Sequence, residues 1–198
     1  MRWLPPVLIV AAATVLALVV ARGEDRPRAA PSPSPTPTAA TETSFLTYQD
    51  EQAGFSIDYP ADWQRLRSSE QQVRLLATPN GRDLMLVRAV PLGVAVSSEE
   101  ELAAARQVTD DLVTDNPDVE LLTDPVQLEH AGLPGWFYFY RFRDQASGRP
   151  GVHSHFFLFR DDTMFVMVFQ ALPEERFEEL APVFDRIAES FQVTGQRG

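Results

Sequence analysis

The 198-residue sequence contains no cysteine and no lysine, so all 17 of its strongly basic residues are arginines. The absence of cysteine excludes a disulfide scaffold, a thiolate zinc site, a cysteine nucleophile and a lipid-modified N-terminal cysteine. Apolar residues make up 44% of the chain and charged residues 23%. These proportions are those of a globular protein and exclude a collagen, a coiled-coil rod or a mostly disordered chain.

Positive charge is scarce in the part of the chain that is expected to fold. The formal net charge is -11, and residues 44–198 carry 13 arginines against 25 acidic residues. Such an anionic domain repels phosphate backbones and anionic lipid surfaces. The run 136–143 interleaves aromatic residues with arginine. Sheets that bind RNA stack bases on such residues, but a strand buried on both faces explains the same pattern. We therefore expect no nucleic-acid partner.

The N-terminal part has no charged residue between Arg2 and Arg22. These 19 mostly apolar residues come close to the ~20 that cross a bilayer as a helix. We expect residues 1–21 to be an uncleaved signal anchor, and a signal peptide cleaved after Ala21 is the alternative. The anchor predicts a single-pass plasma-membrane protein with an extracytoplasmic C-terminal domain, and cleavage predicts a secreted protein.

A composition change separates the apolar N-terminus from the expected domain. Within residues 22–43, positions 31–38 alternate proline with serine and threonine, and the whole segment has no large apolar side chain that could fill a core. This pattern predicts an extended polyproline-type linker. The globular domain is expected over residues 44–198.

Period-two alternation and turn residues indicate a domain rich in strands. The run 163–171 is apolar on both faces and is expected to lie centrally in a sheet. The run 120–129 is a weaker strand, interrupted by Pro125. The remaining strands are predicted at 45–48, 54–59, 73–77, 83–90, 136–143 and 152–160.

Two helices are predicted. Ser98 and Glu101 form a capping box that begins a helix ending near residue 114. Its expected inner stripe consists of Leu102, Ala105, Thr109, Leu112 and Val113. The second helix is predicted over 173–191, with Pro182 kinking it or dividing it. Its apolar stripe consists of Phe177, Leu180, Phe184, Ile187 and Phe191.

Short turns between consecutive strands favour antiparallel pairing. The order strands, helix, strands, helix therefore predicts an α+β fold, an antiparallel β-sheet flanked by helices.

The segment 54–63, GFSIDYPADW, resembles the opening signature of PsbP-like domains, an aromatic strand followed by Tyr-Pro and then Trp63. The C-terminal part resembles the same family. It has a hydrophobic strand at 163–171, followed by a helix that begins at Pro173 and ends with residues 187–191. The similarity covers about residues 45–193. It implies an α/β/α sandwich of the exported bacterial type that acts as a non-catalytic accessory or binding domain.

His153 and His155 are candidate metal ligands because residues two apart on a strand point to the same face. A stable zinc site needs further ligands, for which His130 and the Asp161–Asp162 pair are candidates. The alternative is a polar patch on one sheet face. We expect weak divalent metal binding at most, and no other cofactor.

Motifs for catalysis are missing from the sequence, which has no GxSxG elbow, P-loop, HExxH or dinucleotide fingerprint. Asp58, Asp62 and Trp63 could line a small acidic pocket, but a turn-and-cap role explains them more simply. We expect a membrane-tethered binding or assembly-accessory domain with a protein partner at the cell envelope. The alternative is a metal-dependent or carboxylate-based enzyme on the same scaffold.

Overall fold

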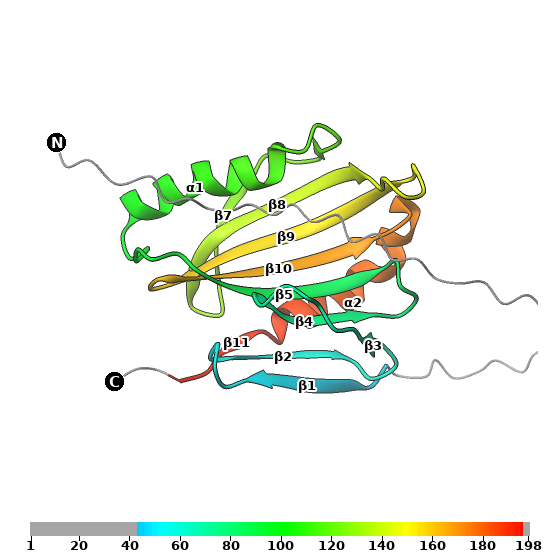
Figure 1. Ribbon diagram of the computed structural model, residues 1–198, viewed down its shortest axis with the longest axis horizontal. Coiled ribbons are helices and arrows are strands. Elements are labelled where there is room, and N and C mark those ends of the chain that lie inside the picture. Colours follow the sequence, from blue (N-terminus) through cyan, green and yellow to red (C-terminus); the bar gives the residue numbers. More distant parts are fainter. Residues whose placement is uncertain (1–42, 196–198) are drawn as a thin grey trace, which may run out of the picture.

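Two antiparallel sheets and two α-helices make up residues 43–195, the part of the chain that this computed structural model describes (Figure 1). The first half contains β1 (Phe45–Asp50), β2 (Phe55–Pro60), β3 (Gln64–Arg65), β4 (Val73–Thr78), β5 (Leu84–Pro91) and α1 (Glu99–Thr114). The second half contains β6 (Glu120–Leu121), β7 (Val126–His130), β8 (Leu133–Arg143), β9 (Pro150–Arg160), β10 (Thr163–Ala171), the 3-10 turn η1 (Glu174–Arg176), α2 (Phe177–Glu189) and β11 (Gln192–Val193).

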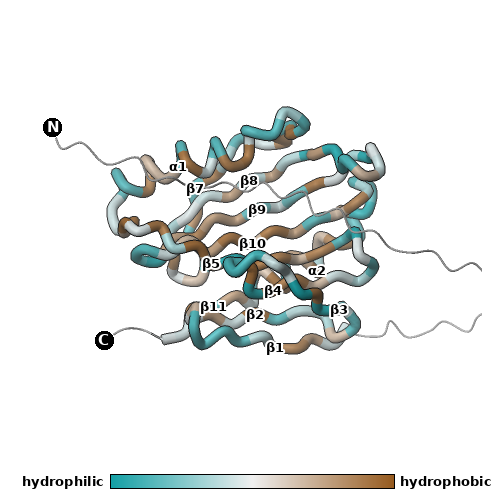
Figure 2. The backbone as a smooth tube through the Cα atoms, in the orientation of Figure 1, coloured by the Kyte–Doolittle hydropathy of each residue, from teal (hydrophilic) through white to brown (hydrophobic). Residues whose placement is uncertain are grey.

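The larger sheet has eight strands in the order β3-β4-β5-β10-β9-β8-β6, and β7 also pairs with β8. Every pairing is antiparallel, which confirms the predicted α+β fold. Strand β10 lies centrally as expected, and its residues from Met164 to Phe169 are all buried. In Figure 2, β10 is hydrophobic along most of its length.

The alternation of side chains along β10 places α1 and α2 on opposite faces of this sheet. Met164, Val166 and Val168 belong to the core formed with α1, whereas Phe165, Met167 and Phe169 belong to the core formed with α2. The predicted flanking of the sheet by helices is therefore present. The capping box of Ser98 and Glu101 is also formed as predicted.

The inner stripe predicted for α1 is correct for Leu102, Thr109 and Val113, which are buried. It is wrong for Leu112, which keeps 36% of its surface exposed. At 100° per residue, Leu112 is about 80° away from Leu102 around the helix axis, while Val113 lies almost directly in line with it.

The second helix divides at a different place from the one predicted. Residues 174–176 form η1, and α2 then runs from Phe177 to Glu189 with Pro182 inside it. Pro182 is exposed and is the sixth residue of α2, beyond the first turn, so it removes one backbone hydrogen bond of the helix. Four of the five predicted stripe residues are buried, and Phe177 is half-buried.

The first two strands do not join the larger sheet, although the sequence predicted one sheet. Strands β1 and β2 pair with each other, and β11 returns from the end of α2 to pair with β2. Phe55, Ile57 and Tyr59 all point to one side of β2 and are buried. Burying this face against the core stabilises β2 beside α2, so the small sheet shares that layer with the helix.

The interruption predicted at Pro125 divides the edge of the larger sheet. Strands β6 and β7 pair with successive parts of β8, and residues 122–125 cross between them. Ala131 and Gly132 both have positive φ, 53° and 73°, in the two-residue turn between β7 and β8. Such a turn suits the twist of a hairpin and fixes the register of β7 on β8.

Candidate functional site

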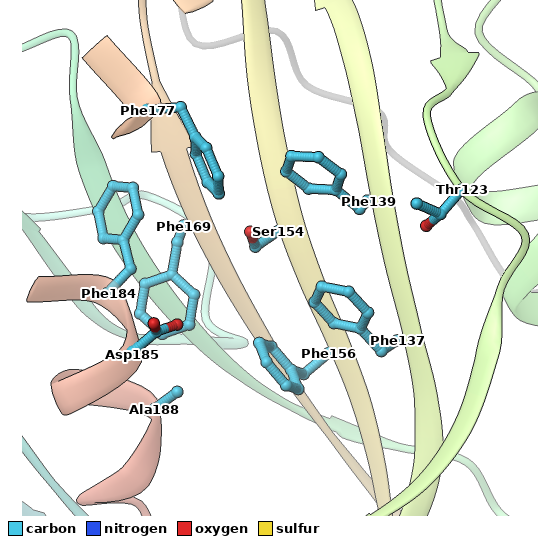
Figure 3. A pocket seen from close by; sticks show the side chains of 10 residues that line it. All are labelled: Thr123, Phe137, Phe139, Ser154, Phe156, Phe169, Phe177, Phe184, Asp185 and Ala188. Atoms are coloured by element: carbon cyan, nitrogen blue, oxygen red, sulfur yellow. The ribbon is translucent and has the colours of Figure 1, made fainter. Parts of the chain in front are cut away.

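An apolar pocket of about 270 Å³ lies between α2 and strands β8, β9 and β10. Six phenylalanine side chains from four elements surround Ser154 in this pocket, and the polar groups Thr123 and Asp185 lie at its rim (Figure 3). The lining residues are Thr123, Phe137, Phe139, Ser154, Phe156, Phe169, Phe177, Phe184, Asp185 and Ala188. We call this site the phenylalanine pocket.

The aromatic strand β8 supplies different residues to the two faces of the sheet. On the α1 face Trp136 donates to the carbonyl of Leu102 at 3.0 Å, and the Tyr138 hydroxyl donates to Asp110 at 2.7 Å. That face of β8 is thus closed by α1. On the other face, Phe137 and Phe139 are only half-buried. The prediction that this run is buried on both faces was wrong for these two residues, because α2 does not cover them fully.

Ring contacts hold the walls of the phenylalanine pocket in place. Ring centroids lie 4.8 Å apart for Phe137 and Phe156, and 4.9 Å apart for Phe139 and Phe177. At one end, Nε2 of His130 lies 2.8 Å from the carbonyl oxygen of Ala188 and joins β7 to α2. These tertiary contacts fix the positions of the pocket walls.

A second, more open hollow of about 420 Å³ adjoins the pocket, because Phe177 lines both. Its other lining residues are Val152 and the three carboxylates Glu174, Glu175 and Glu178. Arg141 forms ion pairs with Glu174 and with Glu120, the latter at 2.7 Å. These two carboxylates raise the pKa of the Arg141 guanidinium.

His153 and His155 lie on the same face of β9, as predicted, and this is the face opposite the phenylalanine pocket. Nδ1 of His153 lies 2.9 Å from the Tyr140 hydroxyl, and Nδ1 of His155 lies 3.1 Å from the same oxygen. Nε2 of His153 lies 2.7 Å from the side-chain oxygen of Gln170. Although neither residue is fully buried, Nε2 of His155 is sealed from solvent and has no hydrogen-bond partner.

Burial keeps both imidazoles neutral. It lowers the pKa of His153 to about 4 and the pKa of His155 well below the usual value, with a further contribution at His155 from His153 and Arg88. Both ring nitrogens of His153 already have protein partners. Within residues 43–195 no three side chains of His, Asp or Glu lie together in a geometry that could hold a metal ion. The structure therefore does not bring His130, Asp161 or Asp162 to the histidine pair.

The other candidate residues have structural surroundings. Asp58 accepts a 2.6 Å hydrogen bond from Thr47 on the neighbouring strand. Trp63 is buried, with its ring 6.3 Å from that of Phe184 in an edge-to-face arrangement. These contacts favour the turn-and-packing interpretation of the 58–63 segment over an acidic pocket.

The expected anchor, residues 1–21, and nearly all of the expected linker, residues 22–43, lie outside the described residues. Within the described range, no helix has the length and apolar character needed to span a membrane.

The antiparallel sheet between two helices defines a PsbP-like α+β domain, an architecture shared with cyanobacterial PsbP (CyanoP) from Synechocystis sp. PCC 6803. The TM-score with that solution structure is 0.52, at 15% identity, covering 80% of this chain and 97% of the other. Residues 43–193 match the model of the PsbP family. The chain belongs to the PsbP family, as the resemblance of segment 54–63 predicted.

Two other solved structures are similar at low identity. A protein from Bacteroides thetaiotaomicron VPI-5482 has a TM-score of 0.53 and 11% identity, covering 77% of this chain and 49% of the other, so this chain spans about half its length. LpqN, involved in cell envelope biogenesis of Mycobacterium tuberculosis, has a TM-score of 0.49 and 15% identity, covering 79% and 87% of the two chains. No curated protein matches the sequence.

The sequence did not predict the phenylalanine pocket. Its six phenylalanines come from β8, β9, β10 and α2, and each has the spacing of an ordinary core residue. The one available signal was the excess of phenylalanine, 13 residues, of which five lie between Phe137 and Phe157. Which of these rings stay half-exposed depends on how α2 packs, and the helix pattern does not encode that.

Proposed function

We propose that this protein is a membrane-tethered, extracytoplasmic accessory domain that binds a protein partner at the cell envelope and catalyses no reaction. The observation that carries the proposal is the phenylalanine pocket. Half-buried aromatic rings held open to solvent are a feature of recognition sites, because each ring gains free energy when a partner covers it.

The arrangement of polar groups also favours binding over catalysis. Ser154 is the hydroxyl nearest the centre of the pocket, and its sequence neighbours are His153 and His155. Alternation along β9 directs the two imidazoles to the opposite face of the sheet, so neither can act as the base that activates a serine. A nucleophile without a base gives little support to a hydrolytic mechanism.

The location is part of the same proposal and is supported by the sequence. Residues 1–21 have the length and composition of a membrane-spanning helix, and residues 22–43 have those of an extended spacer. The anionic domain disfavours nucleic acids and anionic lipid surfaces as partners. A protein at the envelope is compatible with both the anionic charge and this location.

Site-specific photo-crosslinking in intact cells tests this proposal. A photoreactive amino acid replaces Thr123 at the rim of the pocket in the full-length chain, and Thr114 on α1 serves as the matched exposed control. We expect a protein adduct from position 123 that is absent from position 114. Equal labelling at both positions, or no protein adduct at position 123, would count against a partner that binds at the pocket.

A further inference from the structure

We propose that the phenylalanine pocket binds a protein segment that presents one large apolar side chain next to arginine or lysine. The apolar side chain enters the pocket, and the basic side chains lie over the carboxylates of α2 and of the adjoining hollow. This inference deepens the proposed function and rests on it.

The size of the pocket favours a single anchor side chain. Its volume of about 270 Å³ lies just below the ~300–1,000 Å³ that is usual for small-molecule and cofactor sites. Its lining is dominated by phenylalanine and offers few polar groups that could orient a cofactor. Interfaces between proteins, in contrast, often centre on one aromatic or aliphatic anchor in such a pocket.

The side of α2 next to the pocket is acidic. Glu178, Asp185 and Glu189 are exposed and follow one another at spacings of seven and four residues, which places them on one side of the helix. Asp185 lines the pocket, and Glu178 lines the adjoining hollow. No ion pair joins these three carboxylates to another residue of the described range.

The nearby cations do not neutralise this acidic side. Arg176 pairs with Asp83 and with Glu179, and Arg186 lies over the ring of Phe45 at 4.2 Å. Arg141 is held by Glu174 and Glu120. The charge around the pocket therefore complements a basic segment and repels an acidic one, as well as a fatty-acid carboxylate or an anionic lipid headgroup.

Binding of three short peptides to the full-length chain, held in nanodiscs of neutral phosphatidylcholine, tests the inference by fluorescence anisotropy. The first peptide carries Phe followed by two Arg, the second replaces Phe by Ala, and the third replaces both Arg by Glu. We expect the first peptide to bind about tenfold more tightly than either of the others. Equal affinities for the first and second peptides would overturn the anchor, and equal affinities for the first and third would overturn the charge preference.

Variants of the protein locate the binding site. Asp185→Lys combined with Glu178→Lys should weaken binding of the first peptide about five- to tenfold and strengthen binding of the third, whereas the control Asp115→Lys, just after the end of α1, should change neither. Thr123→Trp should narrow the mouth and weaken the first peptide without a change in thermal stability. Binding that all these variants leave unchanged would place the peptide elsewhere and refute the inference.

A third set of measurements tests specificity and separates this inference from the proposed function. Unlabelled first peptide should displace the labelled peptide, and a lack of displacement would show that the binding is non-specific and refute the inference. If a protein is crosslinked at position 123 while the peptides show no preference, only the chemistry of the segment is wrong. If position 123 also gives no protein adduct, the proposed function fails with it.

Discussion

At the scale of single residues, the histidine pair shows how burial and hydrogen bonding determine a protonation state. Gln170 donates to the carbonyl of Arg82 at 2.6 Å, so its side-chain oxygen is free to accept from Nε2 of His153. Nδ1 of His153 then accepts from the Tyr140 hydroxyl, whose oxygen accepts from Nδ1 of His155. His153 and His155 are both neutral in this hydrogen-bond network. The network ends at Nε2 of His155, which has no partner.

Protonation of these rings should destabilise the folded domain. The folded pKa of His153 is about 4 and that of His155 is also depressed, while an unfolded histidine titrates near 6.5. The unfolded state therefore binds more protons, so the stabilising contribution is complete above pH 6.5 and is lost progressively as the pH falls toward 4. For His153 alone we expect a loss of about 1–2 kcal/mol between pH 7.5 and pH 5, measured by urea unfolding.

The double variant His153→Asn, His155→Phe provides the comparison, because it removes both titrating groups. Its free energy of unfolding should fall less over the same pH interval than that of the unchanged protein. Addition of Zn²⁺ should leave the melting temperature of both proteins nearly unchanged, since two imidazoles supply at most two of the four ligands of a closed zinc site. A zinc-dependent rise in melting temperature that disappears in the double variant would instead identify the pair as ligands.

At the scale of elements, the sequence predicted what local periodicity encodes. The stripe through Leu180, Phe184 and Ile187 identified α2, and the doubly apolar run 163–171 identified the central strand. The split of the strands into two sheets depends on where the buried face of β2 packs, and the two-residue strands β3 and β11 are too short to show a period. The pocket could not be predicted for the same reason, since it is formed where α2 stops covering β8.

Asp83 joins several of these elements and should be essential to their arrangement. It is fully buried, and its carboxylate accepts from the amide of Leu172 at 3.0 Å, from Arg176 at 2.7 Å and from Asn80 at 2.7 Å. These bonds connect the start of β5 to the segment that leads into α2 and positions Phe177. Asp83→Ala leaves these donors unsatisfied and should lower the free energy of unfolding by about 2–4 kcal/mol.

Chemical denaturation measures this loss, and Asp62→Ala is the matched control because Asp62 is an exposed aspartate. The control should change the free energy of unfolding by less than about 0.5 kcal/mol. A similarly small effect of Asp83→Ala would show that the hydrogen bonds around it contribute little net stability.

At the scale of the whole molecule, the two faces of the larger sheet differ. On β8, α1 seals its face with hydrogen bonds from Trp136 and Tyr138, whereas α2 leaves a pocket and an acidic border. The domain is also strongly anionic, with 25 acidic residues against 13 arginines over residues 44–198. Both faces contribute to the hydrophobic core, and the α2 face also contains the pocket that we propose as the recognition site.

The proposed tether predicts how the full-length protein behaves in cell fractionation. If residues 1–21 remain as a helix in the bilayer, the protein should sediment with membranes and resist extraction by alkaline carbonate, because the apolar run matches the bilayer core. Deletion of residues 1–21 should abolish both properties. A mature protein in the medium that begins at Arg22 would contradict the anchor and leave export intact.

The division of the sheet edge at residues 122–125 also bears on how copies of the chain meet one another. A strand can add to a sheet only along a continuous row of unpaired backbone groups, which is how edge-to-edge aggregation begins. Here one edge ends in the two-residue β3, and the other is divided into the two-residue β6 and the five-residue β7. Within the described residues, the larger sheet therefore offers a second copy of the chain no long edge to extend, even though an apolar pocket lies beside β8.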